Sequence, residues 1–356
     1  MKILLLGEFS GFYTHLSHGL RQLGHDVTLA CSGDGWKKIE GDILLGPSGP
    51  TVRHDLIWYF KALKLHQLAR KYDVIQFINP FSVFPKICFP LTRAFREIRE
   101  NSCRLYMSAA GCDAFFWSHG RKSLRYGPFD DALTIDKSLG SAFFCTNYAY
   151  KINSQIADMV DGIIPVMHEY YVSYAGHPKV KKIIPLPVNL EEIKFKPLKN
   201  NGKIVIFHGI NRPGFKGTRH IEKAFAEIKK KYPRDVECII ANRMPYREYL
   251  EVISRAHVVV DQVNGYSTGM NALISLAMGK IVIGGAEKEG LLSMGMVDSP
   301  VFNAEPSPAS VIENIERILE QKGDIEELSF HSRRFVEENH DYINIASRYL
   351  DLWSGK

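Results

Sequence analysis

The sequence predicts an α/β protein built from two Rossmann-like, doubly wound domains that face a cleft. Three observations predict this class. Apolar runs of four or five residues indicate buried strands, stretches with helical spacing lie between them, and the pattern starts again after a polar stretch near residue 200. Short buried strands that alternate with helices are typical of parallel sheets. A chain of 356 residues is also long enough for two domains of ordinary size.

The first half begins with a strand–helix–strand unit. An apolar run covers residues 2–6, a glycine-containing loop covers 7–11, and helical spacing then continues to Gly24 before a second apolar run at 27–30. Such units carry their ligand-binding loops at the carboxyl ends of the strands. Further strands are expected at 74–77, 104–107 and 162–166, and helices at 56–71, 85–99 and 149–157.

The second half repeats this organisation after a linker. Residues 185–187 and 196–202, rich in Pro, Lys and Asn, predict that linker. Strands are then expected at 203–207, 236–240, 257–260 and 281–284, and helices at 218–231, 309–322 and 326–353. We therefore expect a first domain over 1–190, a second over 191–335, and a last helix over 336–356 that packs back on the first domain.

Composition narrows the class of ligand and the location. The 45 basic and 39 acidic residues give a net charge of +6, which favours anionic ligands or membrane surfaces, and no basic tail or RNA-binding signature indicates nucleic acid. Six scattered cysteines without a Cys-x-x-Cys pair predict free thiols in a reducing compartment. No apolar run is long enough for a signal peptide or a membrane span. A cytoplasmic protein, at most attached to the inner face of a membrane, is expected.

One loop predicts a phosphate site. Residues 208–217, here called the anion loop, lie directly after an expected strand and before an expected helix. Unpaired N–H groups and the helix dipole make a helix start suitable for an anion, and Arg and Lys can add charge-assisted contacts. The alternative is a solvated basic loop followed by a helix cap at Thr218. The loop's glycines and cations are Gly209, Gly214, Gly217, Arg212 and Lys216.

A second segment follows the expected strand at 257–260 and offers hydroxyls and free amides at another helix start. Such groups suit a phosphate or sugar hydroxyls, although an ordinary Ser/Thr helix cap has the same sequence. Its residues are Tyr266, Ser267, Thr268, Gly269, Met270 and Asn271.

These segments together resemble GT-B glycosyltransferases, especially glycosyltransferase family 4. The anion loop is similar to the family's Gly-Arg…Lys-Gly segment, and residues 269–280 are similar to its Gly-Phe-Gly…Glu-Ala-Met-Ala-x-Gly-Lys segment. Residues 110–113 resemble its His-Gly-x-Asp loop, and 335–342 resemble its closing helices. The resemblance covers most of the chain and is best in the second half.

The resemblance implies a nucleotide-sugar donor held mainly by the second domain. Arg212 and Lys216 would neutralise the donor diphosphate, and Gly209 with residues 266–271 would hold the phosphate or sugar. Gly11 would face the donor from the first domain. Asp113, the polar residue of the Gly-Asp loop, is the third candidate catalytic residue beside Arg212 and Lys216. The implied chemistry is sugar transfer with retention at the anomeric carbon, in which fixed cations and helix starts stabilise the departing diphosphate. No cofactor is expected beyond the donor itself, and the sequence has no Asp-x-Asp or His-Glu-x-x-His motif.

The chain departs from the family at the two glutamates that flank the helix start, whose positions hold Tyr266 and Ile274. Asp261, Asn271 or the pair Glu287 and Glu289 are the candidates to replace them. The histidine of the Gly-Asp loop is also absent. The expected function is transfer of a sugar to a glycan or lipid-linked acceptor in cell-surface (capsule-type) polysaccharide biosynthesis. A sugar-nucleotide epimerase of similar shape and a non-catalytic sugar-nucleotide-binding partner protein stay open.

Two weaker features of the sequence each allow a structural and a functional interpretation. His15, near the loop after the first strand, is either a structural residue or a group that approaches the cleft, and the structural role is favoured. Two expected helices carry basic residues at near-helical spacing, which suits an anionic lipid surface or, slightly better, ordinary surface helices. These basic residues are Lys61, Lys64, Arg70, Lys71, Lys86, Arg93, Arg96 and Arg99.

Overall fold

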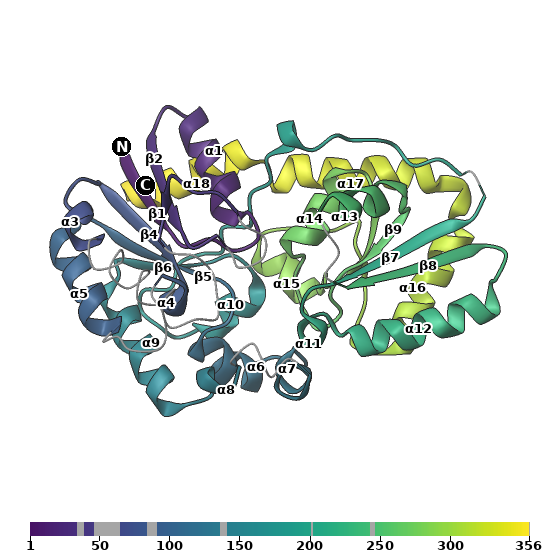
Figure 1. Ribbon diagram of the computed structural model, residues 1–356, viewed down its shortest axis with the longest axis horizontal. Coiled ribbons are helices and arrows are strands. Elements are labelled where there is room, and N and C mark those ends of the chain that lie inside the picture. Colours follow the sequence, from purple (N-terminus) through teal and green to yellow (C-terminus); the bar gives the residue numbers. More distant parts are fainter. Residues whose placement is uncertain are drawn as a thin grey trace. The chain divides into compact units, whose positions relative to one another are not determined.

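The computed structural model describes residues 1–33, 39–45, 65–83, 91–135, 141–200, 202–242 and 246–355 (Figure 1). The chain divides into two compact units. Unit 1 consists of Met1–Ser123, Phe143–Asn189 and His340–Lys356, and unit 2 of Leu124–Ala142 and Leu190–Asn339. Each unit contains a parallel sheet with helices, which confirms the predicted class of two doubly wound α/β domains.

The sheet of unit 1 has the strand order β3-β2-β1-β4-β5-β6. Its central strand β1 pairs in parallel with β2 and β4, so that Ile3 lies opposite both Val27 and Val74. The order reverses between β1 and β4, and ligands of open parallel sheets bind at such a reversal. The strands are β1 Lys2–Leu6, β2 Asp26–Cys31, β3 Ile43–Leu44, β4 Val74–Ile78, β5 Leu105–Ala109 and β6 Gly162–Pro165.

The C-terminal helix α18 belongs to unit 1 and packs on α1, as the sequence predicted. A Cβ at Gly19 of α1 would lie 2.3 Å from the carbonyl oxygen of Tyr342, so the close approach of these helices requires glycine there. The main helices of the unit are α1 Phe12–Gln22, α3 Leu65–Ala69, α4 Asn79–Ser82, α5 Leu91–Asn101, α6 Arg121–Ser123, α9 Asn147–Met159, α10 His168–Ser173 and α18 Tyr342–Ser354, with a π-helical turn at Phe116–Gly120. Along the chain, the boundary between Ala142 of unit 2 and Phe143 of unit 1 falls within the short helix α8, Ser141–Phe144.

The stretch 326–353, expected to be nearly all helical, contains two helices, α17 and α18, and the last helix begins at Tyr342 instead of at residue 336. The break lies at His340 and Asp341. The Asp341 carboxylate accepts hydrogen bonds from the N–H groups of Ile343 and Asn344 at 3.1 and 2.9 Å and thereby caps α18. A capping aspartate inside an otherwise helical pattern is the signal that marks the second start.

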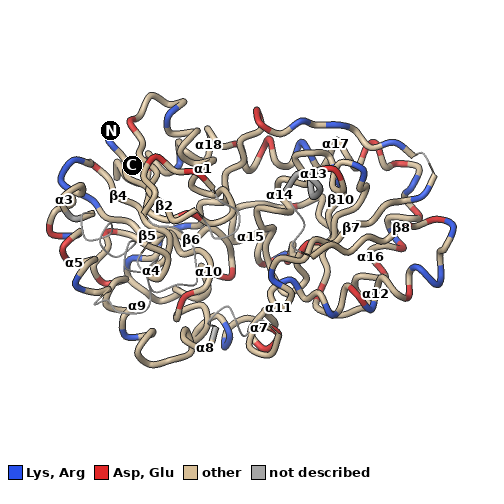
Figure 2. The backbone as a smooth tube through the Cα atoms, in the orientation of Figure 1, with Lys and Arg blue, Asp and Glu red and all other residues tan. Residues whose placement is uncertain are grey.

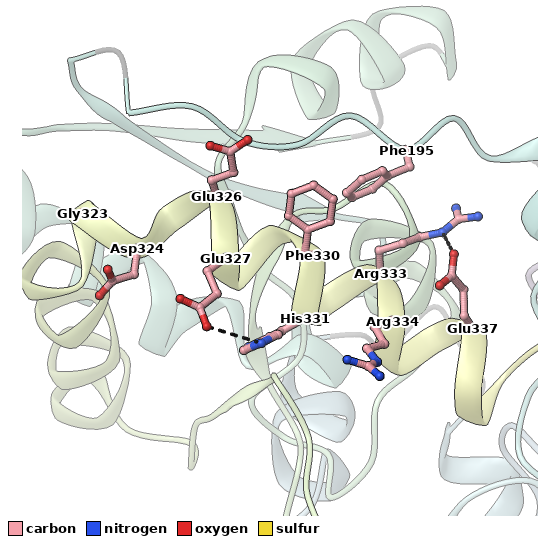
Figure 3. A pocket seen from close by; sticks show the side chains of 10 residues that line it. All are labelled: Phe195, Gly323, Asp324, Glu326, Glu327, Phe330, His331, Arg333, Arg334 and Glu337. Carbon is pink, nitrogen blue, oxygen red and sulfur yellow. Dashed lines mark hydrogen bonds and ion pairs between the residues drawn. The ribbon is translucent and has the colours of Figure 1, made fainter.

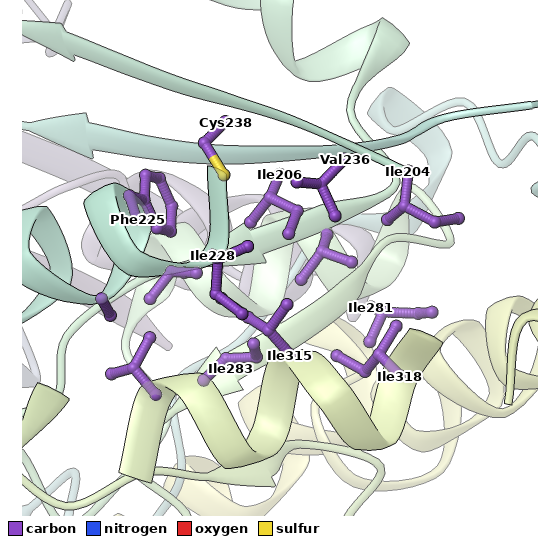
Figure 4. Close-up of a cluster of buried hydrophobic side chains, with 14 of the residues drawn as sticks. Ile204, Ile206, Phe225, Ile228, Val236, Cys238, Ile281, Ile283, Ile315 and Ile318 are labelled. Atoms are coloured by element: carbon purple, nitrogen blue, oxygen red, sulfur yellow. The ribbon is translucent and has the colours of Figure 1, made fainter. Parts of the chain in front are cut away.

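The sheet of unit 2 has the order β11-β10-β9-β7-β8, with its reversal between β7 and β9. Ile206 of β7 belongs to the cluster drawn in Figure 4, which packs the sheet against α12 and α16, whereas the next residue, Phe207, packs with Ile253 of α13. The sheet therefore buries both faces, as parallel sheets do. The strands are β7 Ile204–Ile210, β8 Val236–Asn242, β9 Val258–Val260, β10 Ile281–Gly284 and β11 Phe302–Asn303. The main helices are α7 Phe129–Thr134, α11 Pro213–Lys216, α12 Thr218–Lys231, α13 Tyr246–Arg255, α14 Met270–Ala277, α15 Lys288–Ser293, α16 Pro308–Glu320 and α17 Ile325–Asn339.

The units differ from the expected domains at two places. Leu124–Ala142, here called the excursion, was expected in the first domain and belongs to unit 2, and the final crossing lies between Asn339 and His340 instead of after residue 335. The excursion is fixed to unit 2 by polar and ionic side chains, described below, and such contacts leave no periodic signal in a sequence.

Candidate functional site

The anion loop turns tightly between β7 and α12. After β7 the chain forms the short helix α11, and Gly217 then takes a left-handed conformation with φ of +70°. A Cβ at Gly217 would lie 2.5 Å from the side chain of Val263, and the Val263 N–H donates to the Lys216 carbonyl at 3.1 Å. Glycine is therefore required here by conformation and by space, and the loop is held against the segment that follows β9.

Helix α12 follows the anion loop. The alternative interpretation of this loop required a helix cap at Thr218, and that cap is not formed. Gly217 is the N-cap of α12 and provides no side-chain hydrogen bond. The Thr218 hydroxyl instead lies 3.0 Å from Nε2 of His208, whose Nδ1 is 2.8 Å from the Val260 carbonyl. Burial and the nearby Lys216 charge lower the pKa of His208 to about 4, so the ring is neutral near pH 7, with Nδ1–H donating to the carbonyl and Nε2 accepting from the hydroxyl.

The two segments singled out in the sequence meet through one aspartate. The Lys216 ammonium donates to Oδ1 of Asp261 at 2.7 Å, and Nδ2 of Asn271 donates to the same oxygen at 2.9 Å. The Lys216 and Asp261 side chains are 8% and 4% exposed. Asp261 is the first residue after β9, so this cluster lies where the strand order of unit 2 reverses. The sequence named all three residues and did not predict that Lys216 would be paired with a carboxylate.

Arg212 occupies the other end of α11. It is the N-cap residue of that helix and is half-buried, and its guanidinium carbon lies 3.4 Å from the centroid of the Phe215 ring. Stacking on an aromatic face restricts the side chain and leaves its charge in place. Gly209, at the end of β7, is half-buried as well.

The start of α14 is likewise open. Its N-cap is Gly269, with φ of −83° and ψ of 170°, and this residue provides no side-chain cap. The Ser/Thr cap that was the alternative here is therefore not formed. Gly269 and Asn271 are half-buried. An uncapped helix start leaves N–H groups for an anion.

The other side chains of this segment face the protein interior. The sequence expected them to offer hydroxyls to a ligand, but the Thr268 hydroxyl donates to the Gly285 carbonyl at 3.2 Å and Ser267 is 1% exposed. Tyr266 and Met270 are also buried. The half-buried positions of this segment are therefore Gly269 and Asn271.

Tyr266 and Glu287 anchor the excursion. The Tyr266 hydroxyl accepts from the Arg125 N–H at 2.8 Å, and the Arg125 guanidinium lies 2.6 Å from the Glu287 carboxylate and 3.7 Å from that of Glu289. The Tyr126 hydroxyl donates to Glu287 at 2.6 Å. Burial raises the pKa of Glu287, but hydrogen bonds from Asn303 and Tyr126 and the Arg125 charge outweigh it and hold the pKa below its usual value. Glu287, a candidate to replace a missing family glutamate, is thus used inside the protein.

In unit 1 the residues of the strand-order reversal have unusual backbone conformations. Gly11, the N-cap residue of α1, has φ of +88°, and Ser10 and Asn79 have φ of +57° and +24°. The Glu8 carboxylate accepts from the Thr14 N–H in the first turn of α1 at 2.8 Å. Asn79 follows β4, and its side chain donates to the Ala110 carbonyl at 2.8 Å, so the loops after β4 and β5 are joined. Non-glycine residues at positive φ cluster at functional sites, which agrees with the expected position of Gly11 in a ligand loop.

His15 has the structural role that the sequence favoured. Its Nδ1 accepts from the Asn189 N–H at 3.2 Å, and burial and the nearby His18 lower its pKa to about 4.

Asp113 is a correction. The sequence made it a catalytic candidate, but its side chain is fully buried and both of its oxygens are used. Oδ1 accepts from the Phe116 N–H at 2.8 Å and Oδ2 accepts from the Tyr174 hydroxyl at 2.7 Å. Burial raises the pKa of Asp113 to about 6 in spite of these bonds. The Asp113 side chain caps the turn that follows it, and none of its surface is exposed to a substrate.

An open groove of about 880 Å³ lies on α17, outside the segments singled out in the sequence (Figure 3). Phe330 and Phe195 lie against each other at its floor with ring centroids 5.2 Å apart. Glu327 pairs with His331, and Arg333 pairs with Glu337, both at i,i+4 spacing. Charges paired along one helix describe a solvated helix face.

The basic helices are better described as ordinary surface helices. Arg93 pairs with Glu97 at 3.1 Å, Arg99 pairs with Asp161 at 2.9 Å, and Arg70 donates to Asn101. Figure 2 shows acidic residues among the basic ones of α5. Lys61, Lys64 and Lys86 lie outside the described residues, as do the first parts of the helices expected at 56–71 and 85–99. Of the helices that the structure describes, none has the length and apolar character that crossing a membrane requires.

The comparisons with known proteins identify the fold. No family model matches the sequence, and no curated protein sequence matches it. Among solved structures the chain is similar over its whole length to sucrose-phosphate synthase from Thermosynechococcus elongatus, with 16% identity, a TM-score of 0.65 and coverage of 99% of that chain. It is also similar to HepE from Anabaena in complex with UDP-glucose (13%, 0.61, both chains covered fully). A third similar structure is UDP-GlcNAc 2-epimerase from Neisseria meningitidis bound to UDP-GlcNAc (10%, 0.54, both covered fully). The chain therefore has the GT-B fold.

Proposed function

We propose that this protein is a glycosyltransferase that moves a sugar from a nucleoside diphosphate to an acceptor. The observation that carries the proposal is the meeting of Lys216, Asp261 and Asn271 at the strand-order reversal of unit 2, beside the uncapped starts of α12 and α14. Ligands of doubly wound sheets bind at this point, and uncapped helix starts with cations suit a diphosphate. Similar GT-B structures hold UDP or UDP-glucose.

In the proposed reaction the charge that develops on the departing diphosphate is the main quantity to stabilise. Arg212, fixed by Phe215, supplies a cation, and the N–H groups at the start of α14 near Gly269 supply oriented donors. Lys216 adds its charge from within the cluster with Asp261. The donor needs no cofactor in this scheme, and transfer proceeds with retention of the anomeric configuration. A glycan or lipid-linked acceptor, in cell-surface polysaccharide synthesis, completes the proposal.

The test is incubation with a panel of nucleotide sugars, with and without acceptor glycans. We expect release of free nucleoside diphosphate and growth of the acceptor, both reduced in Arg212→Ala. Arg255→Ala is the matched control, because Arg255 is a surface cation of the same unit that pairs with Glu237. A wild-type protein that binds no nucleotide sugar would refute the proposal.

An epimerase is the second candidate, because UDP-GlcNAc 2-epimerase has the same fold. The same assay separates the two functions. Interconversion of two sugars on the nucleotide, without acceptor, would replace the transferase by the epimerase, and binding without turnover would indicate a non-catalytic sugar-nucleotide-binding protein.

A further inference from the structure

The excursion lies against the anion loop. Within unit 2, helix α7 of the excursion packs on α11, the helix that ends in Lys216. Arg125 and Tyr126 fix the beginning of the excursion to Glu287 and Tyr266. A segment whose neighbours along the chain belong to unit 1 is therefore part of the surroundings of the proposed diphosphate site.

Asp131 of α7 is the residue that joins the excursion to the helix after the anion loop. Its side chain is 7% exposed, and its two oxygens receive Nη2 and Nε of Arg219 at 2.8 and 3.0 Å. Such a two-fold pair between a guanidinium and a carboxylate fixes both groups in direction. Arg219 lies in the first turn of α12, so α7 is held at that helix start.

Asn264 connects this pair to the anion loop itself. The residue is 3% exposed and lies in the segment that follows β9. Its Nδ2 donates to the Gly214 carbonyl at 2.8 Å and to Oδ2 of Asp131 at 3.3 Å. Since an amide nitrogen carries two hydrogens, both are used. The Asn264 side chain also lies against Gly217, because a Cβ there would be 3.1 Å from its Oδ1.

We propose that Asn264, oriented by Asp131, is a positioning residue for the anion loop, so that the docked excursion sets the geometry of the diphosphate site. This inference rests on the proposed function. Asn264 contacts the loop at Gly214 and at Gly217, on either side of Lys216, and it touches no reacting group in this scheme. Asp131 holds the amide in the orientation that reaches Gly214.

This arrangement predicts that docking of the excursion and binding at the diphosphate site are coupled. If the docked excursion favours the loop conformation that binds a diphosphate, then the diphosphate favours docking of the excursion to the same extent. A residue that merely stabilised unit 2 would produce no such link, because its loss would weaken the whole unit and leave the relative affinity for different ligands unchanged.

The experiment compares the affinities of UDP and uridine, which differ only in the diphosphate, in wild type, Asn264→Ala and Asp131→Asn. We expect the ratio of the uridine Kd to the UDP Kd to fall about tenfold in Asn264→Ala, the effect of about one lost buried hydrogen bond, and to fall less in Asp131→Asn, which keeps one oxygen. Asn314→Ala is the matched control. Asn314 is a buried asparagine of α16 in the same unit, and its Nδ2 also donates to two groups, the Asn303 and Ser310 carbonyls.

Hydrogen exchange gives the second measurement. UDP should slow exchange of the amides of α7 in wild type and in Asn314→Ala, and should not do so in Asn264→Ala. An unchanged affinity ratio in folded Asn264→Ala, or equal protection of α7 in that variant, would overturn the positioning role while leaving the proposed function intact. A wild-type protein that binds neither UDP nor inorganic pyrophosphate would refute the proposed function, and this inference with it.

Discussion

Replacing either member of the Lys216–Asp261 pair should destabilise the fold strongly. The two groups are 2.7 Å apart and their side chains are 8% and 4% exposed, so each is nearly out of water. Lys216→Met leaves a buried carboxylate whose remaining partner is the Asn271 amide, and Asp261→Asn leaves a buried ammonium. An uncompensated buried charge costs about 3–5 kcal/mol. We expect each single variant to lose about that much free energy of unfolding in urea.

The double variant separates stability from binding. Lys216→Met with Asp261→Asn removes both charges, and the new asparagine oxygen can still accept from Asn271. We expect the double variant to lose less than about 2 kcal/mol, because replacing a buried pair by neutral groups is often close to neutral. UDP affinity measured by calorimetry should stay low in the double variant, since the cation proposed to face the diphosphate is gone.

The two measurements can each contradict this reasoning. Additive losses in the double variant would show that the two charges do not depend on each other, and the pair would then not be buried as described. Wild-type affinity for UDP in a stable double variant would show that Lys216 has only a structural role, and Arg212 with the helix starts would then hold the diphosphate alone.

Three further outcomes are expected. Arg212→Ala should weaken UDP binding by about 1.5–3 kcal/mol, the range of a charged hydrogen bond, with the unfolding transition unchanged; unaltered affinity by titration would remove it from the phosphate site. Gly269→Val should abolish UDP binding in a folded protein. The backbone there, with φ of −83° and ψ of 170°, suits any residue, but the added side chain covers the amides of the α14 start. Ile274→Ala, at a half-buried position, should cost about 2 kcal/mol of stability and keep UDP binding. Asp113→Asn should remove one pH dependence of stability. The folded-state pKa of Asp113, about 6, lies above the unfolded value, so the aspartate loses stability as pH rises from about 4 to 6 and the asparagine does not. Lost turnover with intact UDP binding would restore its catalytic role.

The fold could be predicted because strand burial and helix period are local signals. The runs at Lys2–Leu6 and Ile281–Gly284 and the helix Thr218–Lys231 have the expected bounds. The helix break at Asp341 was missed because the residues on both sides keep helical spacing, and only the capping carboxylate marks the end. The place of the excursion was missed because Arg125 and Asp131 act through partners more than 80 residues away.

The site could be predicted only in part. Loop position after a strand was enough to place Arg212, Lys216 and the α14 start on the loops that follow β7 and β9, where the strand order of unit 2 reverses. Which side chains face a ligand was not predictable. The hydroxyls of Tyr266 and Thr268 have the right chemistry and the right position along the chain, but their partners are Arg125 and Gly285. Asn264 and Asp131 carried no signal, because a buried amide and a buried carboxylate look like surface residues in a sequence.

The charged side chains at the strand-order reversal of unit 2 also determine how an anion would be held there. Lys216 and Asp261 together carry no net charge, and Asp131 and Arg219 cancel in the same way. A diphosphate that reaches the starts of α12 and α14 therefore meets the positive ends of two helices and the charge of Arg212, and not three unpaired cations. Oriented N–H groups need no reorganisation when charge develops on the diphosphate. Lys216, in contrast, must first divide its hydrogen bonds between Asp261 and the diphosphate. In the proposed site the backbone near Gly269 would thus have the larger part in holding the diphosphate, and Lys216 would strengthen the site to the extent that the diphosphate draws it away from Asp261.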